Sequence, residues 1–283
     1  MSFPRPGRRD SSPRCASDFR YRPMTKQRES HSTDVLYGIN AVKEAIGFRP
    51  IDHVLVREGA SGNRLQEVLN ESRARGIPVR FAPRQALERM AQTVHHQDVV
   101  AVCSSRTYED LSTVVGCQSP ALLLVLDGVE DPANLGAIVR TSVGAGANGV
   151  VIAERRAAGL SPAVARTAAG ALEHARIARV KNLVRTLVEL KEQGLWIYGL
   201  EARAEKSYLD LDYKLPCALV MGGEGHGLHR LVREACDQLA AIPLRGQVES
   251  LNVSVATGIV LYEALRQRLS LEFSSARDEH GRR

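Results

Sequence analysis

Polar side chains that could do chemistry occur in three segments, each next to an apolar run that predicts a strand. Asn134 and Arg140 lie in the first segment, Glu224 in the second, and Ser250 and Asn252 in the third. Amide, guanidinium, carboxylate and hydroxyl groups can together hold and orient one polar ligand through hydrogen bonds. If the fold brings the three segments together, we expect a binding or catalytic site there.

Taken singly, these residues also have structural explanations. On a helix, Arg140 would be a solvated residue. Ser250 or Asn252 would cap the helix that follows them, as Asn134 would in the first segment. The segment around Glu224 has four glycines in six residues and could form a bare turn. A carboxylate in the middle of that turn favours a ligand site, because glycine leaves backbone N–H and C=O groups open to close approach.

Three further features have simpler explanations. We expect His226 to be a solvated loop histidine rather than a general base. Residues 144–149 spell G-x-G-x-x-G, but a predicted helix precedes them and a strand follows, the reverse of the order in a dinucleotide-binding site. They predict a turn that ends a helix, which argues against a nicotinamide-dependent dehydrogenase. His95 and His96 have no carboxylate or cysteine cluster at ligand spacing, so no metal is expected.

Strands and helices alternate through the second half of the chain. Its first apolar run is continuous, which is typical of a parallel strand buried on both faces. The predicted strands are 121–126, 149–153, 195–200, 217–221 and 239–242. The predicted helices are 135–143, 161–168, 183–192, 228–235 and 254–269. This alternation predicts an α/β sheet with its ligand site at the carboxyl ends of the strands.

A smaller αβαβαβ unit is predicted before it. Its expected helices are 35–46, 63–75 and 84–90, and its expected strands are 51–56, 78–81 and 99–103. The mixed stretch that follows, with Ser, Thr, Gly and Pro, predicts a linker. The expected divisions are a disordered basic tail at 1–33, a small α/β domain at 34–104, a linker at 105–118, a second α/β domain at 119–275 and a polar tail at 276–283.

The net charge of +6 comes mostly from the N-terminal tail. Residues 1–33 hold eight Lys and Arg against three Asp and Glu, and the other 250 residues hold 30 against 29. A basic tail attracts phosphate backbones without sequence preference, so it favours RNA or DNA contact but identifies no site. Five cysteines without a C-x-x-C pair argue against a disulfide framework or a zinc site and fit a reducing cytosol. No run approaches about 18 apolar residues, so no membrane span is expected.

Taken together and in order, the three polar segments closely resemble the three sequence motifs of the SpoU/TrmH family of RNA ribose 2'-O-methyltransferases, within the SPOUT superfamily. The resemblance covers about residues 119–270. The N-terminal unit, through residues 36–42 and 96–98, looks like the RNA-binding substrate domain of the members that methylate a guanosine in the peptidyl-transferase region of 23S ribosomal RNA. Asp98 stands where those members usually have glycine.

The resemblance implies a C-terminal SPOUT domain with a parallel sheet and a trefoil knot, preceded by a small α/β RNA-binding substrate domain. It also implies a homodimer with its active site at the subunit interface, and S-adenosyl-L-methionine held by the knot loops mainly through backbone groups. The cofactor-binding positions carried over are Leu200, Glu201, Gly222, Ile242 and Leu251. The catalytic positions carried over are Arg140, Asn134, Glu224, Ser250 and Asn252.

The implied reaction makes modest demands on the protein. A ribose 2'-hydroxyl must lose a proton as it attacks the methyl carbon of a sulfonium, and positioning the two reactants can supply about 7 to 11 kcal/mol of the barrier. In the family, the residue matching Arg140 is proposed to activate the hydroxyl. Because an arginine is normally always protonated, a role as a clamp on phosphate and alkoxide is equally open. The other four catalytic positions would orient Arg140 and the ribose, and no metal is needed.

The leading hypothesis is therefore a cytoplasmic enzyme that uses S-adenosylmethionine to methylate a guanosine ribose in 23S ribosomal RNA, either free or in an assembling large subunit. One alternative is the same reaction on transfer RNA or on another ribosomal RNA loop, as in thiostrepton-resistance enzymes. A second alternative is a ribosome-assembly RNA-binding protein without catalysis. The presence of all five catalytic positions argues against the second alternative, because a pure binding protein has no need of them.

Overall fold

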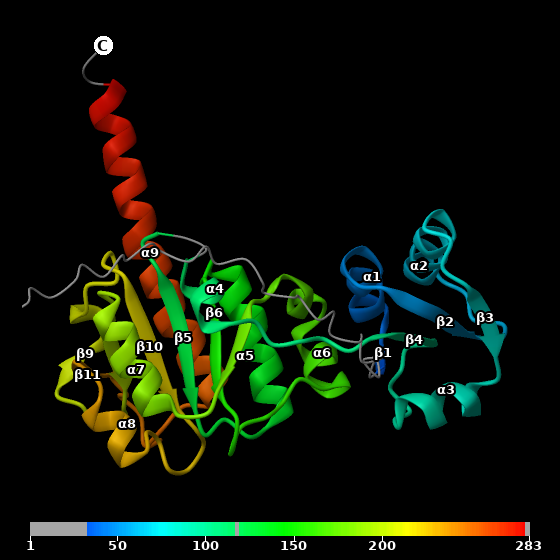
Figure 1. Ribbon diagram of the computed structural model, residues 1–283. Coiled ribbons are helices and arrows are strands. Elements are labelled where there is room, and N and C mark those ends of the chain that lie inside the picture. Colours follow the sequence, from blue (N-terminus) through cyan, green and yellow to red (C-terminus); the bar gives the residue numbers. More distant parts are fainter. Residues whose placement is uncertain (1–32, 117–118, 281–283) are drawn as a thin grey trace, which may run out of the picture. The chain divides into compact units, whose positions relative to one another are not determined.

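The computed structural model describes residues 33–116 and 119–280, with side chains described up to residue 270. The expected basic tail at 1–33 therefore lies outside the described residues except for Thr33, as do the last three residues of the expected polar tail. The described chain contains two sheets (Figure 1). Within this range, no helix is both long enough and apolar enough to cross a bilayer.

The smaller sheet has four strands in the order β1-β4-β2-β3, with β1 antiparallel to β4. Its strands are β1 (Thr33–Tyr37), β2 (Ile51–Arg57), β3 (Val79–Ala82) and β4 (Val99–Ser104). Its helices are α1 (Ile39–Phe48), α2 (Asn63–Ala74) and α3 (Arg84–Ala91). The sequence predicted one helix over 35–46, and its first part was wrong. Gly38, with φ +92°, turns the chain between β1 and α1, so the unit begins with a strand.

The larger sheet has seven parallel strands in the order β7-β6-β5-β10-β8-β11-β9. Its strands are β5 (Leu122–Asp127), β6 (Gly149–Ala153), β7 (Ile177–Val180), β8 (Trp196–Leu200), β9 (Lys206–Ser207), β10 (Cys217–Gly222) and β11 (Gln238–Ala241). Its helices are α4 (Leu111–Gly116), α5 (Pro132–Gly144), α6 (Pro162–Ala168), α7 (Leu183–Glu192), α8 (Arg230–Glu234) and α9 (Val253–His280), with 3-10 turns η1 (Ala171–His174) and η2 (Tyr208–Asp210). The α/β class and the parallel sheet are confirmed. The trefoil knot stays a prediction.

The linker expected at 105–118 contains structure. Helix α4 lies within it, and Glu109 forms an isolated parallel bridge with Ala178 of β7. Most of this segment thus packs at the edge of the larger sheet instead of spanning open space. The division of the chain into domains stays a proposal.

Strand β5 is buried on both faces, as its continuous apolar sequence predicts. Successive strand residues point to opposite sides of a sheet. Leu122, Leu124 and Leu126 pack into the cluster that includes α5 and α9 residues. Leu123 and Val125 pack into the cluster that includes α4, α7 and α8 residues. Each fully buried leucine contributes roughly 1.5–3 kcal/mol, so β5 is fixed in the centre of the sheet.

A buried carboxylate on η1 joins the two sheets electrostatically. The Glu173 side chain is only 3% exposed, and it accepts hydrogen bonds from Arg49 at 2.6 Å and from Arg106 at 3.2 Å. Arg49 also pairs with Asp34 at 3.2 Å. Glu173 therefore pairs with two largely buried guanidinium groups, of which that of Arg106 has no other carboxylate partner among the described residues.

We predict that Glu173→Gln lowers the free energy of unfolding by about 3–5 kcal/mol, because removing one partner of a buried ion pair leaves an uncompensated charge. Urea denaturation followed by circular dichroism measures the change. Glu234→Gln is the matched control, since its pair with Arg230 is exposed and should contribute less than about 1 kcal/mol. Equal losses of stability in the two variants would show that Glu173 contributes no more than an exposed ion pair.

Candidate active site

The three polar segments leave the sheet at one edge. They follow β5, β10 and β11, which are parallel members of the larger sheet, so the carboxyl ends of these strands face the same way. A shared edge of this kind is where α/β sheets bind their ligands. Asn134 of the first segment is 90 residues from Glu224 of the second, and Glu224 is 28 residues from Asn252 of the third, but the three residues meet here in space.

The glycine-rich loop, residues 223–228, is held against the end of β5 by its backbone. The Gly223 N–H donates a hydrogen bond to the Asp127 carbonyl at 2.7 Å. A Cβ on Gly223 would lie 1.9 Å from the Gly128 carbonyl oxygen, and one on Gly222 would also meet backbone. We expected these glycines to give a ligand access to the backbone. The structure adds that Gly222 and Gly223 are required because backbone packs on backbone.

Asn134, Glu224 and Asn252, one from each segment, form a hydrogen-bonded group that we call the amide–carboxylate cluster. The Asn134 side-chain amide donates to Glu224 Oε1. The Asn252 amide donates to Asn134 Oδ1 at 3.0 Å and to Glu224 Oε1 at 3.3 Å. No described residue donates a hydrogen bond to Glu224 Oε2, so one carboxylate oxygen stays available to a ligand.

Asn134 is free to join the cluster because another residue caps its helix. The sequence suggested that Asn134 could cap a helix beginning at 135. Instead α5 begins at Pro132, and the Asp131 carboxylate accepts hydrogen bonds from the N–H groups of Ala133 and Asn134. Proline at the first helical position and aspartate at the cap are favoured signals for a helix start. Asn134 is thereby buried in the first turn with its amide aimed at Glu224.

Asn252 has both of the roles considered from the sequence. Its Oδ1 accepts hydrogen bonds from the Ser254 N–H at 2.8 Å and the Ser254 hydroxyl at 2.6 Å, which caps the start of α9. Its Nδ2 joins the cluster. A single asparagine therefore fixes the last helix relative to the other two segments.

Arg140 and Ser250 lie outside the cluster. Ser250 is exposed in the loop before α9. Arg140 is exposed on α5 and forms no hydrogen bond or ion pair with any described residue. It follows Asn134 by six residues, which at about 100° per residue turns it about 240° around the helix axis. Within one chain, Arg140 thus points away from Asn134.

A cavity of about 690 Å³ contains all five predicted cofactor-binding positions. Its lining includes Leu200, Glu201, Gly222, Ile242 and Leu251. It is also lined by Ser250 and by the cluster residues Glu224 and Asn252. Apolar surface with a few convergent polar groups is typical of a small-molecule site.

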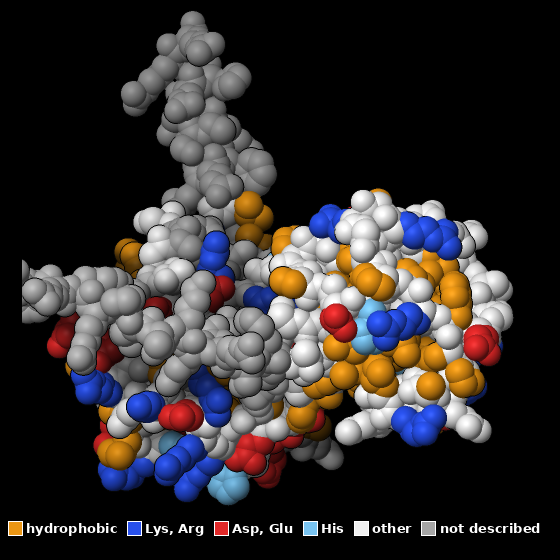
Figure 2. Space-filling view, turned by 45° about the vertical axis from the view of Figure 1, so that its right-hand side comes forward, with side chains coloured by type: hydrophobic (Ala, Val, Ile, Leu, Met, Phe, Trp, Pro, Cys, Tyr) orange, Lys and Arg blue, Asp and Glu red, His pale blue; other side chains and the backbone are white. Residues whose placement is uncertain are grey.

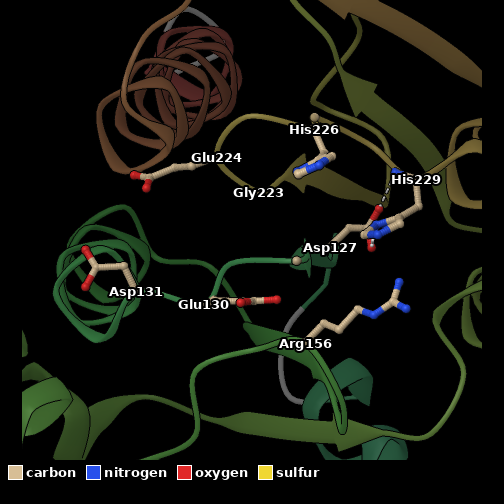
Figure 3. Close-up of a pocket in the computed structure, with 10 residues that line it drawn as sticks. Asp127, Glu130, Asp131, Arg156, Gly223, Glu224, His226 and His229 are labelled. Atoms are coloured by element: carbon tan, nitrogen blue, oxygen red, sulfur yellow. Dashed lines mark hydrogen bonds and ion pairs between the residues drawn. The ribbon is translucent and has the colours of Figure 1, made fainter.

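A second cavity, of about 850 Å³, is also lined by the glycine-rich loop, together with the end of β5 and the loop after β6 (Figure 3). Asp127, at the end of β5, accepts hydrogen bonds from the His229 N–H at 2.7 Å and from His229 Nδ1 at 2.9 Å. Arg156 also lines this cavity. We did not predict these three residues as part of a site. Asp127 could have been noticed in the sequence, because it is a polar residue at the end of an apolar strand. Its pairing with His229, which is 102 residues away, could not be predicted from nearby sequence.

Of the two histidines considered as metal ligands, His95 is exposed and His96 is buried. His96 is 1% exposed, its Nδ1 accepts the Asp98 N–H at 3.1 Å, and burial lowers its pKa. In the described part of the chain, no three His, Cys, Asp or Glu side chains gather as a metal site would require. Asp98 has φ +63°, a left-handed conformation that explains why glycine suits this position. Its carboxylate pairs with Arg57 at 2.7 Å.

Comparisons with known proteins agree with this geometry. Residues 121–262 match the model of the SpoU rRNA Methylase family, and residues 35–109 match a model described as RNA 2'-O ribose methyltransferase substrate binding. The 23S rRNA (guanosine-2'-O-)-methyltransferase RlmB of Xylella fastidiosa (strain 9a5c) is 46% identical over 82% of this chain and 96% of its own length. The putative TrmH family tRNA/rRNA methyltransferase YacO of Bacillus subtilis (strain 168) is 41% identical over 84% of this chain and 98% of its own.

The structural comparison gives the same result. The crystal structure of the SpoU methyltransferase AviRb from Streptomyces viridochromogenes, in complex with the cofactor AdoMet, superposes with a TM-score of 0.70 at 26% identity, covering 84% of this chain and 91% of that one. The first family model spans the strands and loops that form both cavities and the cluster, and the resemblance seen in the sequence is confirmed. The chain belongs to the SpoU rRNA methylase family, the SpoU/TrmH ribose 2'-O-methyltransferases.

Proposed function

We propose that this protein transfers a methyl group from S-adenosylmethionine to the ribose 2'-oxygen of a guanosine in 23S ribosomal RNA, in the cytoplasm. The observation that carries the proposal is the amide–carboxylate cluster at the rim of the cofactor-sized cavity, built from all three polar segments. The 46% identity to a 23S rRNA guanosine methyltransferase supports the substrate. The AdoMet complex of a solved family member supports the cofactor.

The 690 Å³ cavity fits S-adenosylmethionine in size and chemistry. Ligand pockets of about 300–1,000 Å³ enclose molecules of this class. Leu200, Ile242 and Leu251 offer apolar surface for an adenine ring, and Gly222 presents backbone without a side chain. When bound there, the cofactor supplies an electrophilic methyl group. Glu224 and Asn252 line the same cavity and would meet the ribose at its edge.

The cluster would position the ribose. Two amides hold Glu224 Oε1, so the direction of the carboxylate is fixed before any ligand arrives. Glu224 Oε2 can then accept a hydrogen bond from a ribose hydroxyl, which aligns the 2'-oxygen for in-line attack. Such prearranged polar groups need no reorganisation during the reaction. Ser250, on the rim of the cavity, is placed to add a further hydrogen bond.

Arg140 would act on the cluster of a partner subunit. It points away from its own cluster, on the exposed side of α5. The neighbouring face of α9 carries exposed Val255 and Tyr262, 52% and 54% accessible. Tyr262 lies beside the end of α5, with its hydroxyl 3.5 Å from the position of a Cβ on Gly144. A second copy covering this face would bury apolar surface and bring each Arg140 to the other subunit, where it can stabilise the alkoxide and hold the substrate phosphate.

The same chemistry on another RNA is the second candidate. The relative YacO is named for both transfer RNA and ribosomal RNA, so the target base and RNA class need direct mapping. The substrate-binding match at 35–109 favours an RNA that is large enough to contact the smaller sheet as well as the active site.

We predict that Arg140→Ala lowers methyl transfer at least about 100-fold, the loss typical of removing a group that stabilises developing charge. Its affinity for S-adenosylmethionine should stay unchanged. Mapping 2'-O-methylation across cellular RNA, with the gene deleted and then restored as wild type or variant, identifies the target. Arg185→Ala, an 81% exposed arginine on α7, is the control. Wild-type methylation by the Arg140→Ala variant would show that Arg140 has no role in the reaction.

We predict that Gly223→Ala weakens S-adenosylmethionine binding at least about tenfold. A Cβ 1.9 Å from the Gly128 carbonyl must displace the loop that forms the cavity wall, whereas Gly246→Ala meets nothing within 4 Å and should bind normally. Isothermal titration calorimetry distinguishes the two. Wild-type affinity in the Gly223 variant would show that the loop does not shape the cofactor site.

We predict that Tyr262→Glu converts a dimer into monomers, because it places a charge in the apolar face between subunits. Analytical ultracentrifugation measures the mass. Leu231→Glu, on α8 at 53% exposure, is the control and should leave the dimer intact. A monomeric wild type, or a dimeric Tyr262 variant, would be incompatible with this interface.

A further inference from the structure

The 850 Å³ cavity shares one wall with the cofactor cavity. Gly223, Glu224, His226 and Gly227 line both. Because Glu224 lines both cavities, a ribose at the amide–carboxylate cluster would lie next to both the cofactor cavity and this second space. The second cavity is large enough for a nucleobase, and the proposed function leaves it without an occupant.

Three of the four carboxylates in this cavity are already engaged. Asp127 binds His229, Asp131 caps α5, and Glu224 belongs to the cluster. Glu130 and Arg156 differ from them, because neither forms a hydrogen bond or ion pair with any residue that the structure describes. Figure 3 shows both across the cavity from His226. The two carboxylate oxygens of Glu130 can therefore accept hydrogen bonds, and the guanidinium N–H groups of Arg156 can donate them.

The backbone holds these two side chains in neighbouring positions. Val129, next to Glu130, is 3% exposed, and its carbonyl accepts the Ala158 N–H at 2.8 Å. This bond ties the loop that carries Arg156 to the segment that carries Glu130. Arg156 itself has φ +55°, a conformation that costs energy in a residue other than glycine. Strained residues of this kind persist where the surroundings fix them and are concentrated at functional sites.

We propose that this cavity receives the base of the target guanosine, with Glu130 and Arg156 as the residues that select guanine. This inference rests on the proposed function. Guanine presents four polar groups in sequence along one side: two donors, the N2 amine and N1–H, followed by two acceptors, O6 and N7. A carboxylate can accept from both donors, and an arginine donates in bidentate fashion to O6 and N7.

The other bases do not match this arrangement. Adenine has an acceptor at N1 and an amine at position 6, so it would place a lone pair against Glu130 and a donor against Arg156. RNA-binding proteins commonly read a base in this way once it is splayed out of its stack, and enzymes that modify nucleic acids often extrude their target. Glu130 and Arg156 form no ion pair with each other, so neither has to break one to bind the base.

The test uses full-length protein and synthetic RNA hairpins containing the methylated position found by mapping. The hairpins carry guanosine, inosine, 7-deazaguanosine or adenosine there, and kcat/KM for methyl transfer is measured on each. Inosine lacks the N2 amine, so the wild type should prefer guanosine over inosine by about 10- to 100-fold, the range for a hydrogen bond to a charged group. Glu130→Gln should reduce that preference to less than about threefold.

Arg156→Ala should likewise remove the preference of the wild type for guanosine over 7-deazaguanosine, which lacks the N7 acceptor. Glu192→Gln, an exposed residue on α7, is the control and should keep both preferences. S-adenosylmethionine affinity, measured for every variant, verifies that each one is folded.

The outcomes separate the two proposals. If mapping finds no guanosine whose 2'-O-methylation depends on the gene, the proposed function fails and this inference fails with it. If the wild type methylates guanosine but Glu130→Gln keeps the guanosine-to-inosine ratio, base selection by Glu130 is wrong while the function stands. If Arg156→Ala slows all four RNAs equally, Arg156 contacts phosphate, and its part in base selection is overturned.

Discussion

The site depends on one backbone contact, the hydrogen bond from Gly223 N–H to the Asp127 carbonyl. It joins the loop after β10 to the end of β5 so closely that no side chain fits at Gly223. This contact holds the glycine-rich loop, whose residues line both cavities, against β5. It also places Glu224 within reach of Asn134, which lies 90 residues earlier in the chain. A larger residue would separate these elements.

The amide–carboxylate cluster is oriented by the same residues that cap two helices. Asn252 caps α9 and joins Glu224, and Asp131 caps α5 and so leaves the Asn134 amide for the cluster. The polar groups at this edge of the sheet are therefore oriented by the starts of two helices, which are rigid elements. The arrangement matches a reaction whose barrier is lowered mainly by alignment of two bound reactants. Arg140 and Ser250 are both exposed outside this framework, and Arg140 lies on the outer side of α5.

Sequence patterns predicted the elements whose signal is continuous and local. The apolar run of β5 could be read directly, and the helix predicted at 254–269 lies within α9, although Val255 and Tyr262 of its expected apolar face are exposed. Residues 35–37 were misread because their apolar spacing suits a helix as well as a strand, and only the pairing of β1 with β4 decides between them. Strands β7 and β9 have four and two residues, too short for a periodic pattern to show.

The sequence predicted which residues belong to the candidate site but not which hydrogen bonds join them. Family motifs pointed to Asn134, Glu224 and Asn252, yet their hydrogen bonds link positions 28 to 118 residues apart. The opposite direction of Arg140 follows from its place on α5, which depends on where that helix begins. Asp127 and His229 were missed because their contact depends on the fold alone.

The most direct test of the two-subunit site is complementation between inactive subunits. Arg140→Ala and Glu224→Gln chains, each with a different affinity tag, are co-expressed, and the mixed dimer is isolated by sequential purification and assayed for methyl transfer. If Arg140 acts on the partner's cluster, one of the two sites in the mixed dimer has both residues intact, and about half of the wild-type activity returns. A mixed dimer as inactive as either parent would show that Arg140 and Glu224 act within one chain and would contradict the account.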